Sequence, residues 1–80
     1  MKEYIATFHT HLSALMTSKA LSALGLRAQM MPVPRKLSSS CGTCVRYFSE
    51  APQLDAMDAD VEGVYEKLDS ENYLLLMENA

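Results

Sequence analysis

Two cysteines with two residues between them, Cys41 and Cys44, are the side chains of this 80-residue chain best suited to chemistry. A cysteine reacts as its thiolate, and the pKa of a thiol falls near a cation, a helix N-terminus or the second cysteine of a C-x-x-C pair. Gly42 follows Cys41 and permits a turn with positive φ or a close approach of the backbone. These features predict that Cys41 is the reactive residue, through its sulfur, of a loop at residues 38–44.

The residues around Cys41 supply the groups that an anionic sulfur needs. A guanidinium can serve as a counter-ion, and serine hydroxyls can donate hydrogen bonds to an anion. We predict a supporting loop made of Arg35, Ser38, Ser39, Ser40 and Gly42, with His9 and His11 as candidate proton carriers. The alternative is that Cys41 is buried as a small apolar side chain and that the serines only cap a turn.

Cys44 has two open interpretations. Three residues of extended chain span about 10 Å, whereas a disulfide requires Cα atoms within roughly 7 Å. A Cys41–Cys44 disulfide, and a thiol–disulfide redox function with it, therefore requires a turn at Gly42 and Thr43. If Cys44 instead begins the next strand, Cys41 works alone, and the strand-like sequence of residues 44–48 favours this second interpretation.

A zinc site made of the two histidines and the two cysteines is a further alternative. Two nitrogen and two sulfur ligands would satisfy tetrahedral zinc. The order and spacing of His9, His11, Cys41 and Cys44 match no zinc finger or ribbon, however. We therefore predict no metal and no cofactor.

Length and composition restrict the class of protein. Eighty residues allow one domain, over residues 1–80, and 49% apolar with 21% charged residues is typical of a globular protein. The longest apolar run, residues 73–77, is far too short to span a membrane, and the N-terminus has no apolar signal region. We expect a cytoplasmic protein without membrane contact, in which a C-x-x-C pair is more often reactive than a structural disulfide.

Charge is unevenly divided along the chain. Residues 1–48 contain six lysines and arginines and one glutamate, whereas residues 49–80 contain one lysine and nine carboxylates. This asymmetry predicts a face that meets anions, with a mixed, solvated surface as the alternative. Three clustered cations near one loop, without aromatic stacking residues, are too few for a nucleic-acid footprint, so we expect no nucleic-acid partner.

The residue pattern predicts four strands and two helices. Strand-forming residues occupy 3–9, 26–33, 44–48 and 73–77. A first helix follows Thr10 as its N-cap and ends at Gly25, and a second helix covers residues 54–68. The apolar stripe of the first helix comprises Leu12, Met16, Ala20, Ala23 and Leu24, with Ser13 and Thr17 off it. The stripe of the second comprises Leu54, Met57, Val61, Val64, Tyr65 and Leu68.

The order βαββαβ predicts an α+β fold, the ferredoxin-like split β-α-β sandwich, with a four-stranded antiparallel sheet and two helices on one face. Right-handed crossovers make the first and second strands parallel. The end of the first strand, the start of the first helix and the loop between the second and third strands would then share one edge. That edge would carry His9, His11, Arg35 and Cys41.

The chain resembles a family of small bacterial proteins described as putative selenium/sulfur carrier-like, and two segments carry the resemblance most clearly. They are residues 8–10 and, above all, residues 32–42, Pro-Val-Pro-Arg-Lys-Leu-Ser-Ser-Ser-Cys-Gly. The resemblance covers nearly the whole chain, and the Pro-x-Pro-Arg…Ser-Ser-Cys-Gly string is its most specific part. It implies that Cys41 is the carrier atom, with Arg35 and the three serines as its supporting loop. Cys44 does not belong to the family pattern.

The leading hypothesis is a carrier that holds a persulfide or perselenide on Cys41 between a donor protein and an acceptor protein. One alternative is a thiol–disulfide protein that uses Cys41 and Cys44. Another is a non-catalytic interaction module, because both alternating sets of side chains in residues 4–8 are largely apolar. A sandwich with helices on one side leaves its other sheet face open, which predicts a homodimer through that face.

Overall fold

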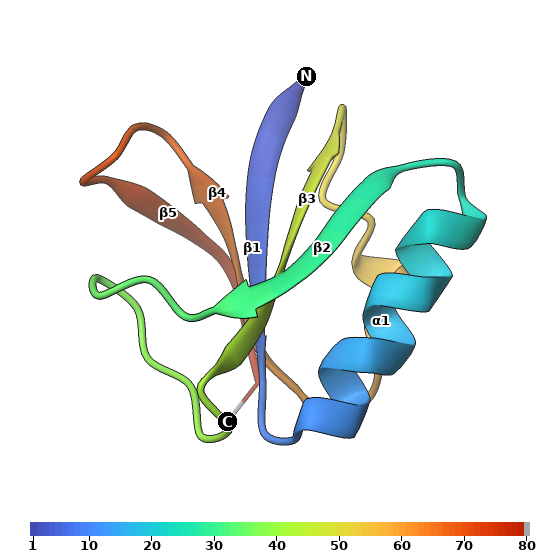
Figure 1. Cartoon of the computed structure of the whole chain (residues 1–80). Helices are drawn as coiled ribbons and strands as arrows, with labels where there is room; N and C mark the ends of the chain where they lie inside the picture. The colour runs from blue at the N-terminus through green and yellow to red at the C-terminus, as the bar shows by residue number, and fades with distance from the viewer. Residues whose placement is uncertain (80) are drawn as a thin grey trace.

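Five strands and one α-helix are formed by residues 1–79, which the computed structural model describes (Figure 1). In chain order they are β1 (Lys2–Phe8), α1 (His11–Ala23), β2 (Arg27–Pro32), β3 (Thr43–Ser49), the short 3-10 helix η1 (Leu54–Ala56), β4 (Val61–Lys67) and β5 (Tyr73–Glu78). The strands form one sheet in the order β2-β3-β1-β4-β5, and every neighbouring pair is antiparallel. Ala80, the last residue of the expected single domain, lies outside the described residues.

The first half of the chain has the split β-α-β arrangement that the sequence predicted. β3 pairs antiparallel with both β1 and β2, so β1 and β2 run parallel with β3 between them. α1 connects these two parallel strands and packs against all three (Figure 1). The end of β1, the start of α1 and the loop after β2 consequently lie at one edge of the sheet.

The second half of the chain is different, and the predicted ferredoxin-like fold is wrong. Residues 54–68 were expected to form a helix, but they form η1, a turn and β4. β4 pairs with β1 on one side and with β5 on the other. The protein therefore has a five-stranded sheet with one helix, instead of four strands with two helices on one face.

A β-bulge explains why this segment looks helical in the sequence. Thr7 lies opposite Gly63 while Phe8 lies opposite Val61, so the register between β1 and β4 shifts by one residue. As a result Val61 and Val64 both join the core that faces α1, although residues three apart in a regular strand point to opposite faces. Apolar residues three apart indicate a helix, and here a bulge produces that spacing.

α1 begins where the sequence predicted, but its buried face is a different one. The Thr10 hydroxyl caps the helix and accepts a hydrogen bond from the backbone N–H of Ser13 at 3.1 Å. The buried residues of α1 are Ser13, Ala14, Thr17 and Leu21. The leucines and the methionine of the predicted stripe, Leu12, Met16 and Leu24, are more than half exposed.

Hydrogen bonds to the segment after η1 account for the buried polar face of α1. The Ser13 hydroxyl donates to Asp58 Oδ2 at 2.6 Å, and the backbone N–H of Asp58 donates to Thr17 Oγ1 at 2.9 Å. The first of these bonds, with help from the backbone N–H groups of Asp60 and Ala59, holds the pKa of Asp58 below its usual value. Satisfied hydroxyls can thus occupy positions that the pattern assigned to solvent.

Both faces of β1 are covered within a single chain. On the side of α1, the core contains alternate residues of β1 with residues of the neighbouring strands, among them Tyr4, Phe8 and Val45. On the opposite side, Ile5 and Thr7 are buried as well. The loop of residues 33–42 lies on that side, away from α1 and towards the β4–β5 hairpin (Figure 1). The face that was expected to be open is therefore partly covered by the chain itself.

The helices are short. α1 has 13 residues, and within residues 1–79 no helix is both long and apolar enough to cross a membrane.

Candidate functional site

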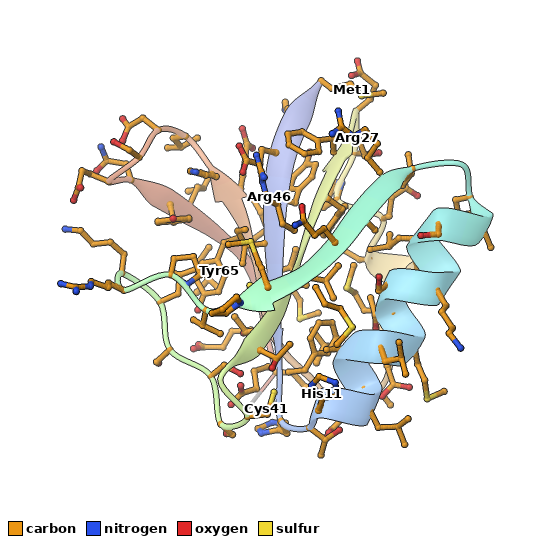
Figure 2. All side chains as sticks on the ribbon, viewed as in Figure 1. Met1, His11, Arg27, Cys41, Arg46 and Tyr65 are labelled. Carbon is orange, nitrogen blue, oxygen red and sulfur yellow. The ribbon has the colours of Figure 1, made fainter. Side chains whose placement is uncertain are left out.

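The predicted site residues other than Arg35 gather at one end of the sheet. β1 ends at Phe8, α1 begins at His11, and the loop of residues 33–42 returns to the same end before β3. Figure 2 shows Cys41 and His11 at this end and Arg27 at the opposite end of the sheet. The expectation that these three segments share one edge is confirmed.

Cys41 is partly buried against the end of β1. Its Sγ lies 3.3 Å from the carbonyl oxygen of Phe8, 3.5 Å from that of Thr43 and 3.7 Å from the hydroxyl of Ser39. The Ser39 hydroxyl also donates to the Phe8 carbonyl, at 2.7 Å. In this arrangement the neutral thiol is the hydrogen-bond donor, and Ser39 is the serine that the fold brings to the sulfur.

Gly42 adopts the left-handed backbone conformation, with φ +73°. Its N–H donates to the carbonyl of Ser39 at 3.3 Å, and its carbonyl accepts from the N–H of Val33 at 3.2 Å. A side chain at this φ would strain the backbone. Gly42 therefore forms the turn that directs Cys41 towards Phe8, and it does so with the positive φ that the sequence indicated.

Ser40 ties the loop to β4 through Glu62. The Ser40 N–H and hydroxyl donate to the two carboxylate oxygens of Glu62, at 3.0 and 2.8 Å. His9 Nδ1 lies 3.4 Å from the Ser40 hydroxyl and 3.3 Å from Glu62 Oε2. One carboxylate thus gathers the residue before the cysteine and the first of the two histidines.

Glu62 is the site residue that the sequence reasoning missed. Burial alone would raise the pKa of Glu62, but hydrogen bonds from Ser40, with Ser39 and the charge of His9, hold it below the ordinary value. The contact is therefore complete at neutral pH and weakens as the pH falls through this lowered pKa. Glu62 falls within the helix predicted over residues 54–68 and outside its apolar stripe, so it was expected to face solvent. The adjacent Gly63 is unfavourable inside a helix, and it was the signal in the sequence that argued against a helix here.

The second histidine and the remaining loop residues lie farther from the sulfur. His11 Nδ1 is 3.5 Å from the Thr43 hydroxyl, which places its ring beside the residue two after Cys41. Arg35 is exposed and makes no ion pair with any residue of the described chain, whereas Lys36 next to it pairs with Glu71 at 3.2 Å. The structure does not bring Arg35 into contact with Cys41.

Ser38 lines a cleft on the side of the loop that faces β4 and β5. The cleft has a volume of about 340 Å³. Its walls are formed by Thr7, Ser38, Glu62, Tyr65, Glu78 and Asn79. Burial and the charges of Glu78 and Glu62 raise the pKa of Tyr65, so this tyrosine remains a neutral hydrogen-bond donor in the cleft.

Cys44 lies in β3, opposite Thr7 and Met31 in the neighbouring strands, and is fully buried. Its Sγ is 3.7 Å from the carbonyl oxygen of Pro32. Burial, and secondarily the charge of Cys41, raise the pKa of Cys44 to about 11. Both cysteines are free thiols. Cys44 therefore packs as a small side chain of the strand, and Cys41 is the accessible cysteine.

The arrangement offers thiol chemistry at one sulfur. Among residues 1–79, no three histidine, cysteine, aspartate or glutamate side chains are grouped so that they could hold a metal ion. The fold and the site define a small α+β protein that presents a single accessible cysteine on a hydrogen-bonded loop at the end of its sheet.

Comparison with known proteins assigns a family to this arrangement. The family described as putative Se/S carrier protein-like matches residues 3–73, and the chain belongs to that family. An uncharacterized protein of Escherichia coli (strain K12), YtiA, is 38% identical over 45 residues. That match covers 56% of this chain and 53% of YtiA, so the two share about half of their lengths. No solved structure gives a significant match.

Proposed function

We propose that the protein carries sulfur or selenium as a persulfide or perselenide on Cys41, between a donor protein and an acceptor protein in the cytoplasm. The observation that carries the proposal is the position of Cys41: a free, partly accessible thiol on a loop anchored by Ser39 and Ser40, in a member of a family named for this role. Cys44 has no part in it, because it is buried inside β3.

The transfer needs no change in total oxidation state. The Cys41 thiolate attacks the outer sulfur of a donor persulfide, a bond forms between the two sulfurs, and the donor S–S bond breaks. The donor leaves as a thiolate with the electron pair, and Cys41 holds the new persulfide. An acceptor thiolate repeats the attack in the second step and frees Cys41.

The flanking residues have separate roles in this proposal. The proton of Cys41 has to leave before the attack, and His9 and His11 are the proton carriers beside the loop, linked to Ser40 and Thr43. Once the sulfur is an anion, it can no longer donate to the Phe8 carbonyl, and the Ser39 hydroxyl, 3.7 Å away, can donate to it instead. Arg35, exposed on the same loop, attracts the anionic persulfide of the donor protein.

A cysteine desulfurase with free cysteine provides the direct test. Mass spectrometry after incubation should find one added sulfur on Cys41, in the wild type and in Cys44→Ser but not in Cys41→Ser. Replacing cysteine with selenocysteine in a parallel reaction tests selenium. A wild-type protein that stays unmodified under conditions that load a known carrier would refute the carrier function.

The predicted homodimer needs a different surface from the one that the sequence suggested, because residues 33–42 already lie on the open sheet face. β5 is an edge strand, and its leucines Leu74, Leu75 and Leu76 are 49, 46 and 36% exposed. An apolar edge strand can pair antiparallel with the same strand of a second copy about a twofold axis. We expect a dimer in sedimentation at micromolar concentration and a monomer for Leu75→Lys. A wild-type monomer would contradict this expectation.

A further inference from the structure

At the end of the sheet opposite Cys41, a group of charged, polar and aromatic side chains lies on the face that is turned away from α1. The strand register places Arg27, Phe48, Glu3 and Lys67 side by side, one from each of four neighbouring strands. In the same register Gln29 and Arg46 lie opposite each other two residues further along. Alternate residues of a strand share a face, so all six side chains point to the same side of the sheet.

Positive charge exceeds negative charge in this group. Arg46 Nε donates to Glu3 Oε2 at 2.6 Å, and Lys67 Nζ lies 3.7 Å from the same oxygen. Arg27 forms no ion pair with another residue of the described part of the chain. The cluster therefore contains three cations and one carboxylate, a formal charge of about +2 that an anion would balance.

The two guanidinium groups are held by one aromatic ring. Arg46 Cζ lies 4.8 Å and Arg27 Cζ 5.7 Å from the centroid of the Phe48 ring. Cation–π contact at these distances orients a guanidinium before any ligand arrives. Nε of Arg46 is used by Glu3, but the two terminal amino groups of the guanidinium donate to no other residue within residues 1–79. Both arginines can therefore offer N–H groups to a ligand.

A cleft large enough for a small molecule lies between these side chains. Its volume is about 470 Å³, within the range of roughly 300–1,000 Å³ that is usual for small-molecule sites. Arg27, Gln29, Arg46 and Phe48 line it together with Ser22, Leu26 and Ala28, so the cleft reaches past the edge strand β2 to the end of α1.

We propose that this cleft binds a phosphate group, presented by a small phosphorylated molecule or as free phosphate. A guanidinium group can bind two phosphate oxygens at once through two parallel N–H···O hydrogen bonds. A carboxylate can accept the same pair of hydrogen bonds. The formal charge of the cluster favours phosphate over carboxylate as the ligand. A phosphate monoester carries about −1.5 to −2 at pH 7 and balances the cluster, whereas a single carboxylate carries only −1. The site is independent of Cys41, which lies at the other end of the sheet (Figure 2).

Titrations of the isotope-labelled protein with inorganic phosphate, glycerol 3-phosphate and acetate, followed by NMR, test the site. We expect both phosphates to shift the amide signals of residues 27–29 and 46–48 at millimolar concentration or below, and acetate to bind at least about tenfold more weakly. Equal affinity for the two phosphates means recognition of the phosphate alone. Tighter binding of glycerol 3-phosphate means that the cleft also contacts the carbon body.

Matched variants separate the site from general attraction to a cation. Arg27→Gln should weaken phosphate binding about tenfold, and Arg27→Lys should weaken it less, because a point charge replaces the guanidinium fork. Lys19→Gln removes an exposed charge on α1 and should change nothing. Equal losses in Arg27→Gln and Lys19→Gln, or no loss in Arg27→Gln, would overturn the proposal. Cys41→Ser should bind phosphate like the wild type, so this result does not depend on the carrier function.

Discussion

The two cysteines should differ by orders of magnitude in their reaction with an alkylating reagent, and this difference follows from the burial of Cys44. Its pKa is raised from 9.0 to about 11, so the thiolate fraction at pH 7 falls from about one in a hundred to about one in ten thousand. The side chain is also 0% exposed, which means that the reagent has to wait until β3 opens locally. The hundredfold loss of thiolate is therefore a lower limit for the slowing of the reaction at Cys44.

Iodoacetamide labelling of the native protein, quenched at intervals and mapped by peptide mass spectrometry, measures both rates. Cys41 should be labelled first, and Cys44 at least about a hundredfold more slowly than the same residue in denaturant. Cys41→Ser and Cys44→Ser give the individual rates without interference. Native labelling of Cys44 within a few-fold of its denatured rate would refute the reasoning. A reversible Cys41–Cys44 disulfide in oxidising buffer would also refute it, and would revive the redox alternative.

Three further outcomes test the packing around the site. Glu62→Gln should speed native labelling of Cys41 up to about tenfold, since a weaker charge-assisted hydrogen bond frees the loop. Glu66→Gln on the same strand is the control, and an equal effect would contradict the role of Glu62. The raised pKa of Cys44 stabilises the fold below pH 9, and this stability, on the order of 2 kcal/mol, should be lost as the pH rises to 11. Denaturant titrations of Cys44→Ala should show a smaller alkaline loss, and an unchanged one would exclude Cys44 as its source. Thr17→Val should lower the free energy of unfolding by about 1–3 kcal/mol, because it leaves a backbone N–H without an acceptor, and Thr17→Ser should not. Equal stability of the two Thr17 variants would mean that this hydrogen bond contributes nothing.

Local signals predicted the order and direction of β1, α1 and β2 correctly, although not the buried face of α1. The strand-forming residues of β1, the cap at Thr10 and the handedness of the crossover were enough to place β1, α1 and β2. They also placed the histidines and Cys41 at one edge. Gly42 was correctly predicted as a turn residue, because the ability of glycine to adopt a positive φ depends on its own backbone and not on distant partners.

Features that depend on distant partners could not be predicted from local pattern. The bulge that puts Val61 and Val64 on one face exists because of the pairing between β1 and β4. Likewise, Ser13 and Thr17 can be buried only because Asp58, far along the chain, satisfies their hydroxyls. Glu62 was missed for the same reason, since its partner Ser40 lies in a loop 22 residues away.

The Phe8 carbonyl, shared by the Ser39 hydroxyl and the Cys41 thiol, gives the loop two attachments to the last residue of β1. In the proposed carrier, a cargo on Cys41 would remove one of them, because the Cys41 sulfur would no longer have a proton to donate. Empty and loaded molecules would then show different loop surfaces to their partners. A donor that recognises the attached loop and an acceptor that recognises the released one would give the transfer a direction, without any energy source beyond the cargo itself.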